Sequence, residues 1–324
     1  MKNNYTMPII LKKQLRAPFK AKDYILHEEL QNAVEVAIAL GQPLLITGEP
    51  GTGKTKLAFK VADELSKDPS ANFSPKPLIF NTKTSSAARD LFYTYDAISH
   101  FQAANIKRED GQAGARTADF IELQALGKAI ALTNPEKIDR SNFATPLPAQ
   151  PQSSVVLIDE IDKAPRDFTN DILNEIENYS FNIKEQNNYQ IDREDSRQIV
   201  VIMTSNSEKN LPDAFLRRCV FYHIPFPSAE LLMEIVKTQL GGGTAFTDQA
   251  LRELLSKFED IRRQAVRKKP ATAELIGWLR VLEMQQYLEK GPAEQEKLLL
   301  QNLSILVKTK EDLEAIRALF KEAG

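Results

Sequence analysis

The chain has 324 residues, of which 42% are hydrophobic, so it can bury the core of one large domain or of two smaller ones. Its formal net charge of −2 gives no general attraction to nucleic acid or to acidic membranes. The one cysteine, Cys219, excludes an intrachain disulfide and suits a reducing cytoplasm. No run approaches the roughly 20 apolar residues of a membrane span, and residues 9–11 are too short an apolar run for a signal peptide. We therefore expect a soluble, cytoplasmic protein.

The first elements expected along the chain lead up to a glycine-rich loop. Residues 1–22 are polar and basic and predict a loose N-terminal extension. Apolar residues at helical spacing predict a helix over 28–40. A short buried strand over 43–47 and an amphipathic helix over 56–65 follow, and the loop lies between them.

This loop, residues 48–55, fits the pattern G-x-x-x-x-G-K-[ST] of phosphate-binding loops. Its glycines let backbone N–H groups close around phosphate oxygens, and the helix that follows adds the positive end of its dipole. Lys54 is expected to reach the β- and γ-phosphates, and Thr55 to bind Mg²⁺. The cofactor-binding residues predicted here are Gly48, Glu49, Pro50, Gly51, Thr52, Gly53, Lys54, Thr55 and Lys56.

The middle of the chain is less regular. Residues 77–81 predict a second buried strand, whereas residues 84–120 fit no single pattern. Apolar residues on one face predict a helix over 120–132. Four prolines between 133 and 154 predict a surface loop.

Strand patterns then continue as far as residue 224. Residues 155–158 form an apolar, β-branched run, which is typical of a central parallel strand that is covered on both faces. A helix around 172–176 and a small hairpin over 181–191 are expected next. Two more buried strands are predicted over 198–204 and 221–224. Helical patterns alone follow from 228, so we place a domain boundary at 225–227.

Polar residues at the ends of these strands complete a candidate catalytic site. Asp159 and Glu160 end one strand, where the ligands of open α/β sheets gather. Asp159 is expected to support Mg²⁺ and Glu160 to activate the attacking water. Asn206 follows the next strand and is expected to position that water, although a turn asparagine without this role remains the alternative.

A pair of arginines, Arg217 and Arg218, follows a short predicted helix. An arginine in such a place can project into the nucleotide site of a neighbouring subunit and stabilise charge in the transition state. Two exposed arginines without a catalytic role are the alternative.

Four of these motifs resemble those of AAA+ ATPases. In chain order they resemble the Walker A, Walker B, sensor 1 and arginine-finger motifs, and they lie at residues 48–55, 157–162, 204–206 and 216–218. Within that family the stretches 159–166, 171–177 and 211–218 are most similar to the MoxR branch, which includes the CbbQ and NorQ activators. The resemblance covers residues 24–285 and gives the finger role to Arg218, with Arg217 left as the alternative.

The resemblance implies a fold and an activity. The expected fold is an α/β P-loop NTPase with an αβα core and a parallel sheet, followed by a smaller all-helical lid domain. It implies an ATPase that acts with ATP and Mg²⁺ in a ring, usually a hexamer. It also implies remodelling of protein partners, often together with von Willebrand A-domain proteins. The domains expected are an extension over 1–22, the core over 23–227 and the lid over 228–324.

The chain departs from this pattern at three places. The stretch from Lys54 to Asp159 is longer than in MoxR proteins, which predicts insertions near 96–120 and 133–152. The lid helix should carry a sensor 2 arginine, but Ala271 or Ala273 stands at the expected position. Either Lys268 or Lys269 takes over this role, or the role is absent. Asn81 either restrains Glu160, as polar switch residues do in AAA+ proteins, or simply ends its strand.

Three functions remain open from the sequence. The first is the Mg²⁺-dependent ATPase just described, with Tyr24 and Ile25 in the adenine pocket by position. The second is an ATP-gated assembly switch in a defence or signalling complex, with little turnover; the presence of Glu160 counts against it. The third is a DNA-associated motor, which the near-neutral charge disfavours.

Overall fold

The computed structural model describes residues 19–109, 114–207 and 211–322. The chain forms two compact units. One is Tyr24–Phe226, and the other joins the part that starts at Pro227 to the N-terminal segment that ends at Asp23. Most of the expected extension over 1–22 lies outside the described residues; its end belongs to the 3-10 turn η1 (Ala21–Asp23).

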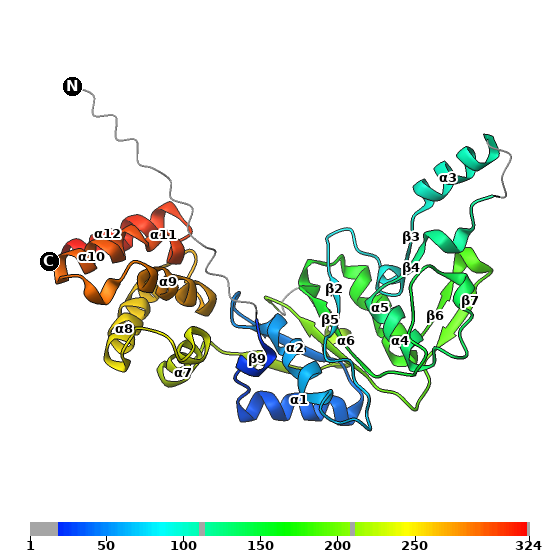
Figure 1. Ribbon diagram of the computed structural model, residues 1–324, viewed down its shortest axis with the longest axis horizontal. Coiled ribbons are helices and arrows are strands. Elements are labelled where there is room, and N and C mark those ends of the chain that lie inside the picture. Colours follow the sequence, from blue (N-terminus) through cyan, green and yellow to red (C-terminus); the bar gives the residue numbers. More distant parts are fainter. Residues whose placement is uncertain (1–18, 110–113, 208–210, 323–324) are drawn as a thin grey trace. The chain divides into compact units, whose positions relative to one another are not determined.

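The first unit is built on a parallel five-stranded sheet (Figure 1). Its strands, in the spatial order β2-β5-β8-β1-β9, are all parallel to their neighbours. In chain order they are β1 (Leu44–Gly48), β2 (Leu78–Asn81), β5 (Ser154–Asp159), β8 (Ile199–Thr204) and β9 (Val220–Ile224). Helices flank this sheet and a helical region follows it, which confirms the predicted αβα core with a C-terminal helical part.

The apolar strand residues alternate between two cores, one on each face of the sheet. In β5, Val156 and Ile158 belong to one core, whereas Val155 and Leu157 belong to the other. Successive side chains of a strand point to opposite faces. A strand that is covered on both faces therefore needs an unbroken apolar run, and this run identified β5 in the sequence.

Helices supply the other half of each core. Residues of α1 and α2 pack in one core, and residues of α4 and α5 pack in the other. Gly41 ends α1 in a left-handed conformation at φ 63°, which glycine adopts readily. The helices of this unit, apart from α3, are α1 (Glu28–Leu40), α2 (Lys54–Leu65), α4 (Ala125–Thr133), α5 (Arg166–Asn178) and the single turn α6 (Asp213–Leu216).

In the region that fitted no single pattern, residues 93–109 and 114–123 contain two strands and a helix, and we call this segment the insertion. Strands β3 (Tyr93–Tyr95) and β4 (Ile121–Leu123) pair antiparallel, and between them α3 (Ala97–Glu109) stands away from the sheet in Figure 1. The predicted helix over 120–132 is wrong in its first part, because residues 121–123 form β4 and α4 begins at Ala125. Ile121 and Leu123 are buried and Glu122 is exposed, a period of two that the longer helical pattern concealed. One 3-10 turn, η2 (Ala88–Leu91), precedes β3, and another, η3 (Thr117–Phe120), directly precedes β4.

Replacing Gly127 by alanine should destabilise this insertion. A Cβ atom at Gly127 would lie 2.0 Å from the main-chain oxygen of Phe92, so α4 or the segment before β3 must shift. We expect a loss of about 1–3 kcal/mol in the free energy of unfolding, measured by urea denaturation. Gly277→Ala is the control, since its Cβ would meet nothing closer than 3.7 Å. Equal stability of the two variants would contradict the prediction.

The remaining short elements of this unit connect the sheet strands. The predicted hairpin is present as β6 (Ser180–Ile183) and β7 (Tyr189–Asp192). The proline-rich stretch before β5 contains one 3-10 turn, η4 (Arg140–Asn142). Two more such turns, η5 (Ile161–Lys163) and η6 (Lys184–Gln186), follow β5 and β6.

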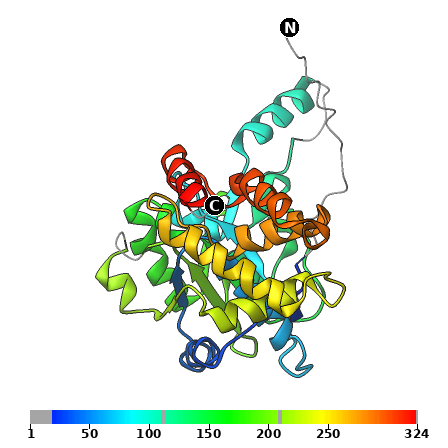
Figure 2. The ribbon, with the colours of Figure 1, turned by 90° about the vertical axis from the view of Figure 1, so that its left-hand side faces the viewer.

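The second unit is helical throughout its described residues (Figure 2). Its core contains an apolar face of α9, on which four side chains are buried: Leu275, Trp278, Leu279 and Leu282. No helix in the described ranges combines the length and the apolar character needed to cross a membrane. The helices are α7 (Ala229–Leu240), α8 (Asp248–Gln264), α9 (Thr272–Met284), α10 (Pro292–Gln301), α11 (Leu303–Leu306) and α12 (Lys310–Glu322), with the 3-10 turn η7 (Tyr287–Glu289).

The carboxylate of Asp312 on α12 holds the loop between α8 and α9. It accepts hydrogen bonds from the backbone N–H groups of Val266, Arg267 and Lys268 at 2.9–3.1 Å and from the Thr309 hydroxyl at 2.8 Å. The Arg267 N–H contributes most, and together these donors lower the pKa of Asp312 to about 2. The loop is therefore fixed by a carboxylate that must stay ionised.

Asp312→Asn should lower the stability of the protein at neutral pH. The pKa of this carboxyl is lower in the folded chain than the ordinary value of about 4. Its contribution is therefore present above pH of about 4 and is lost as the pH falls toward 2. Urea midpoints of wild type and variant should differ at pH 7 and converge near pH 2. Glu311→Gln, at the neighbouring exposed position, should match wild type throughout; a gap that persists at pH 2 would contradict this linkage.

Candidate functional site

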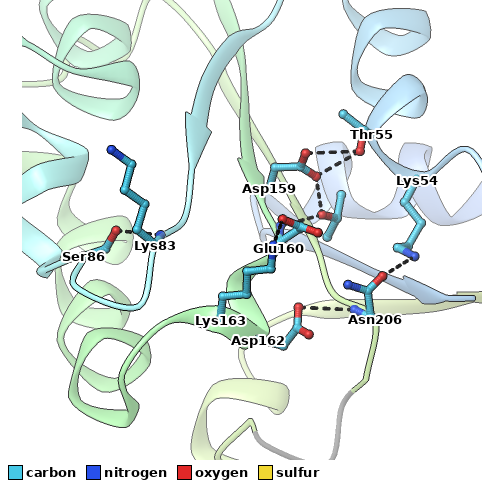
Figure 3. Close-up of polar contacts among 10 residues, drawn as sticks. Lys54, Thr55, Lys83, Ser86, Asp159, Glu160, Asp162, Lys163 and Asn206 are labelled. Carbon is cyan, nitrogen blue, oxygen red and sulfur yellow. Dashed lines mark hydrogen bonds and ion pairs between the residues drawn. The ribbon is translucent and has the colours of Figure 1, made fainter. Parts of the chain in front are cut away.

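The candidate site lies at the carboxyl edge of the sheet. Strands β5, β8 and β1 are neighbours, and the chain leaves them at Asp159, Thr204 and Gly48. Because parallel strands end at the same edge, these chain segments converge although they are far apart in sequence. Figure 3 shows Thr55, Asp159 and Asn206 brought together there.

The loop over 48–55 has the backbone of a phosphate cradle. Three glycines of the loop have positive φ values, which residues with a side chain rarely adopt. These values are 148° at Gly48, 82° at Gly51 and 91° at Gly53. A Cβ at Gly48 would lie 2.7 Å from the main-chain oxygen of Ile224, so no larger residue fits there. The Thr52 hydroxyl donates to the Glu49 oxygen at 2.8 Å and closes the turn. Helix α2 begins directly after Gly53 and points its N-terminus at this loop.

The ammonium group of Lys54 lies inside this loop and is nearly buried, with 8% of the residue exposed. It donates to the main-chain oxygens of Gly48 and Glu49 at 2.7 and 2.9 Å and to Oδ1 of Asn206 at 3.0 Å. Burial lowers the pKa of Lys54, and nearby carboxylates, Asp162 foremost, oppose this shift. The ammonium group of Lys54 could exchange these oxygen acceptors for phosphate oxygens, so its position suits phosphate binding.

Thr55 and Asp159 form a set of oxygen donors. The Thr55 hydroxyl donates to both carboxylate oxygens of Asp159, at 3.0 and 3.2 Å. The buried Thr204 hydroxyl donates to Oδ1 of Asp159 at 2.5 Å and fixes the orientation of that carboxylate. A hydroxyl and a carboxylate are ligands that Mg²⁺ prefers, so these residues fit the cation that the sequence predicts.

Glu160 and Asn206 lie near the pair formed by Thr55 and Asp159. The carboxylate of Glu160 pairs with the ammonium group of Lys163, and the Asn206 backbone N–H donates to Oδ1 of Asp162 at 3.3 Å. Figure 3 shows both residues at the carboxyl edge of the sheet, close to Asp159. The geometry is compatible with their predicted roles on an attacking water.

Arg218 lies near the amino ends of the strands, opposite to the carboxyl ends where the candidate site lies. It precedes Val220, the first residue of β9, which pairs with Leu44 at the start of β1. About 13 Å of strand separates Leu44 from Gly48, at about 3.3 Å per residue. Arg218 therefore cannot reach the phosphate loop of its own chain. Its Nε instead forms an ion pair with Glu177 of α5 at 3.0 Å, and both side chains are about half exposed.

Two further predicted contacts flank the phosphate loop. The ring of Tyr24 packs against Gly53, since a Cβ there would lie 3.2 Å from it. Burial, with a smaller effect of Tyr222, raises the pKa of Tyr24. Ile25 is half-buried beside it, and Lys56 is exposed at the start of α2. Their expected place around an adenine ring stays a prediction.

The lid positions considered for sensor 2 belong to the other compact unit. Ala271 is buried and precedes α9, and Ala273 lies in its first turn. The backbone of Lys268 is held by Asp312, and its side chain is exposed. The assignment of a sensor 2 residue stays a prediction.

Three contacts of the site were missed in the sequence. Thr204 was grouped with Asn206, but its bond to Asp159 depends on β5 and β8 being neighbours. The pairing of Glu177 with Arg218 joins two segments that no local pattern connects. Only the contact of Lys163 with Glu160 had a local signal, because residues three apart on a helical turn can meet.

Comparison with known proteins identifies the family of this chain. A family model described as "AAA domain (dynein-related subfamily)" matches residues 43–219, which is more than half of the chain. No curated protein matches the chain. Among solved structures, domain III of the replication initiation protein DnaA from Thermotoga maritima is 13% identical, with a TM-score of 0.46; the match covers 92% of this chain and 100% of that one.

Two other solved structures are similar at the same level. A variant of RuvB from Thermotoga maritima is 17% identical over 86% of this chain and 67% of its own, with a TM-score of 0.45. The FIGL-1 AAA domain in complex with ADP is 16% identical over 92% of this chain and 88% of its own, with a TM-score of 0.43.

Proposed function

Because this chain belongs to the AAA domain family, in its dynein-related subfamily, we propose that it hydrolyses ATP with Mg²⁺ at the edge formed by β1, β5 and β8. AAA+ ATPases in general bind ATP and Mg²⁺. The observation that carries the proposal is the convergence of two hydrogen-bonded pairs at this edge, Lys54 with Asn206 and Thr55 with Asp159. These are a phosphate-binding cation, two Mg²⁺ ligands and a polar amide.

Each residue then has one task. The backbone N–H groups of residues 48–55 and the ammonium group of Lys54 bind the phosphates, for which Lys54 gives up its present oxygen partners. Thr55 and Asp159 hold Mg²⁺, which when bound neutralises charge on the β- and γ-phosphates. Glu160 accepts the proton of the attacking water, and Asn206 orients that water.

The same family supports assembly into a ring. AAA+ proteins typically form oligomers, and Arg218 is too far from its own phosphate loop to act there. We place Arg218 at the nucleotide of a neighbouring copy, where a guanidinium stabilises transition-state charge. A ring, in the resembling family usually a hexamer, then shares each site between two subunits. We assign the core to the unit Tyr24–Phe226 and the lid to the helical part that starts at Pro227.

A protein partner is proposed as the target of this activity. The resemblance to the MoxR branch suggests remodelling or activation of a protein, with a von Willebrand A-domain protein as the first candidate. The insertion supports a protein contact, because α3 exposes Ile98, Phe101 and Ile106 at 73%, 69% and 61%. The single cysteine supports a reducing cytoplasm as the location.

A second function, the ATP-gated assembly switch with little turnover, is favoured by one contact. The carboxylate of Glu160 is occupied by Lys163, so the proposed base is not free in this conformation. In a switch of this kind, nucleotide binding would set the state of assembly, and hydrolysis would be slow.

Hydrolysis measured against protein concentration tests the proposal. We expect the Mg²⁺-dependent release of phosphate per subunit to rise steeply with concentration as shared sites assemble. A rate that is low, flat with concentration and unchanged by added partner would favour the switch. No nucleotide binding at all would contradict both functions.

A further inference from the structure

The backbone of Glu160 is held in one position by its neighbours. Its φ is 57°, a left-handed conformation that is uncommon for a residue with a side chain. Its N–H donates to the hydroxyl of Thr204 at 2.9 Å, and that buried hydroxyl donates in turn to Asp159. Such conformations persist where surrounding contacts enforce them. Only the side-chain torsions of Glu160 are therefore left to place its carboxylate.

The partner of that carboxylate is Lys163. Its ammonium group donates to Oε2 of Glu160 (Figure 3), and its backbone N–H donates to the Glu160 oxygen at 3.0 Å, which closes the turn η5. The other nearby acid of this turn, Asp162, faces the backbone of Asn206 instead. Asn81 pairs with Asp159 in register and is exposed, and within the described ranges no hydrogen bond joins its side chain to Glu160. Of the two roles left open for Asn81, these contacts favour the end of a strand, and the side chain that meets the Glu160 carboxylate is that of Lys163.

We propose that Lys163 is a positioning residue that holds the Glu160 carboxylate in a resting orientation and thereby limits basal hydrolysis. The inference rests on the proposed ATPase function. A carboxylate oxygen that accepts a hydrogen bond from an ammonium group is less available to take a proton from water. The torsions that bring Glu160 to Lys163 also fix where its second oxygen points.

The restraint is weak enough to be released in each cycle. The side chains of Lys163 and Glu160 are 49% and 44% exposed, and exposed ion pairs stabilise a structure only slightly. Glu160 raises the pKa of Lys163, so the lysine stays charged at neutral pH. Removing it should therefore change the rate by a small factor.

Steady-state kinetics of lysine variants test this directly. Lys163→Met should raise kcat about two- to fivefold and leave KM for ATP unchanged. Lys163→Arg should bring the rate back toward wild type, because a guanidinium can make the same pair. Lys83→Met is the matched control. Lys83 also lies at this edge (Figure 3), but it is the backbone N–H of Lys83 that donates to the Ser86 hydroxyl, and this variant should leave kcat unchanged.

A chemical readout without turnover accompanies the kinetics. Acetylation of Lys163, followed by mass spectrometry in the absence of nucleotide, should be slower in wild type than in Glu160→Gln, since the pair protects the amine. Acetylation of Lys83 should be equal in both proteins. Equal acetylation of Lys163 would overturn the inference.

Different results would contradict the proposed ATPase site and the proposed restraint by Lys163. If Glu160→Gln abolishes hydrolysis while Lys163→Met lowers kcat or leaves it unchanged, the ATPase assignment stands and the restraint is wrong. If Glu160→Gln hydrolyses ATP as fast as wild type, the proposed site fails and the inference fails with it.

Discussion

Replacing Glu160 by glutamine should reduce ATP hydrolysis by about 100-fold or more, because a positioned general base contributes at least that factor. Binding of ATP should survive, since the loop over 48–55 and the pair Thr55–Asp159 do not depend on this carboxylate. Glutamine has nearly the same shape and can still pack in the turn. The measurements are phosphate release and the binding of a fluorescent ATP analogue to the full chain.

Asp167→Asn is the control for that experiment. Asp167 is an exposed acid in the first turn of α5, seven residues after Glu160, and its loss should leave the rate near wild type. If the Glu160 variant kept wild-type turnover, another residue would have to accept the proton. If it lost nucleotide binding as well, the effect would be structural.

Replacing Arg218 by alanine should lower kcat about a thousandfold at concentrations where wild type is assembled. The reason is geometric, because Arg218 lies near the amino ends of the strands and its own phosphate loop lies at their carboxyl ends. In our proposal it can therefore act only on the nucleotide of another copy. Loss of the exposed pair with Glu177 should cost little stability. Arg217→Ala is the control and should retain most activity.

Mixing two inactive variants gives a sharper test of the shared site. Lys54→Ala lacks the phosphate-binding cation, and Arg218→Ala lacks the group that acts across the boundary. A mixture should recover hydrolysis, because some interfaces then pair an intact loop with an intact arginine. No recovery in the mixture would contradict the shared site. An Arg218 variant as active as wild type would contradict the assignment of Arg218 and transfer the role to Arg217 or remove it.

The strands and their polar ends were predictable from the sequence for a local reason. The strands of the sheet are short and mostly apolar runs, and polar residues stand at or just after the carboxyl ends of β5 and β8, at Asp159 and Asn206. Burial on both faces requires the first feature, and the position of ligands in parallel sheets requires the second. Neither depends on which strand lies beside which.

The secondary structure of the insertion was not predictable in the same way. Its strands β3 and β4 are only three residues long and become strands by pairing with each other across α3. Three residues give too short a pattern to separate a period of two from a helical one. The buried hydrophobic residues before Ala125 therefore suggested a longer helix than the structure contains.

The sequence by itself determined the chemistry of this protein: a phosphate loop, a pair of acids, an amide and an arginine, each carried by a pattern of adjacent residues. The tertiary structure decided how these groups are held. The spatial order of the sheet brings Thr204 to Asp159, and the packing of α5 brings Glu177 to Arg218. These pairs join distant segments, and their formation depends on strand order and helix packing, which no local spacing encodes.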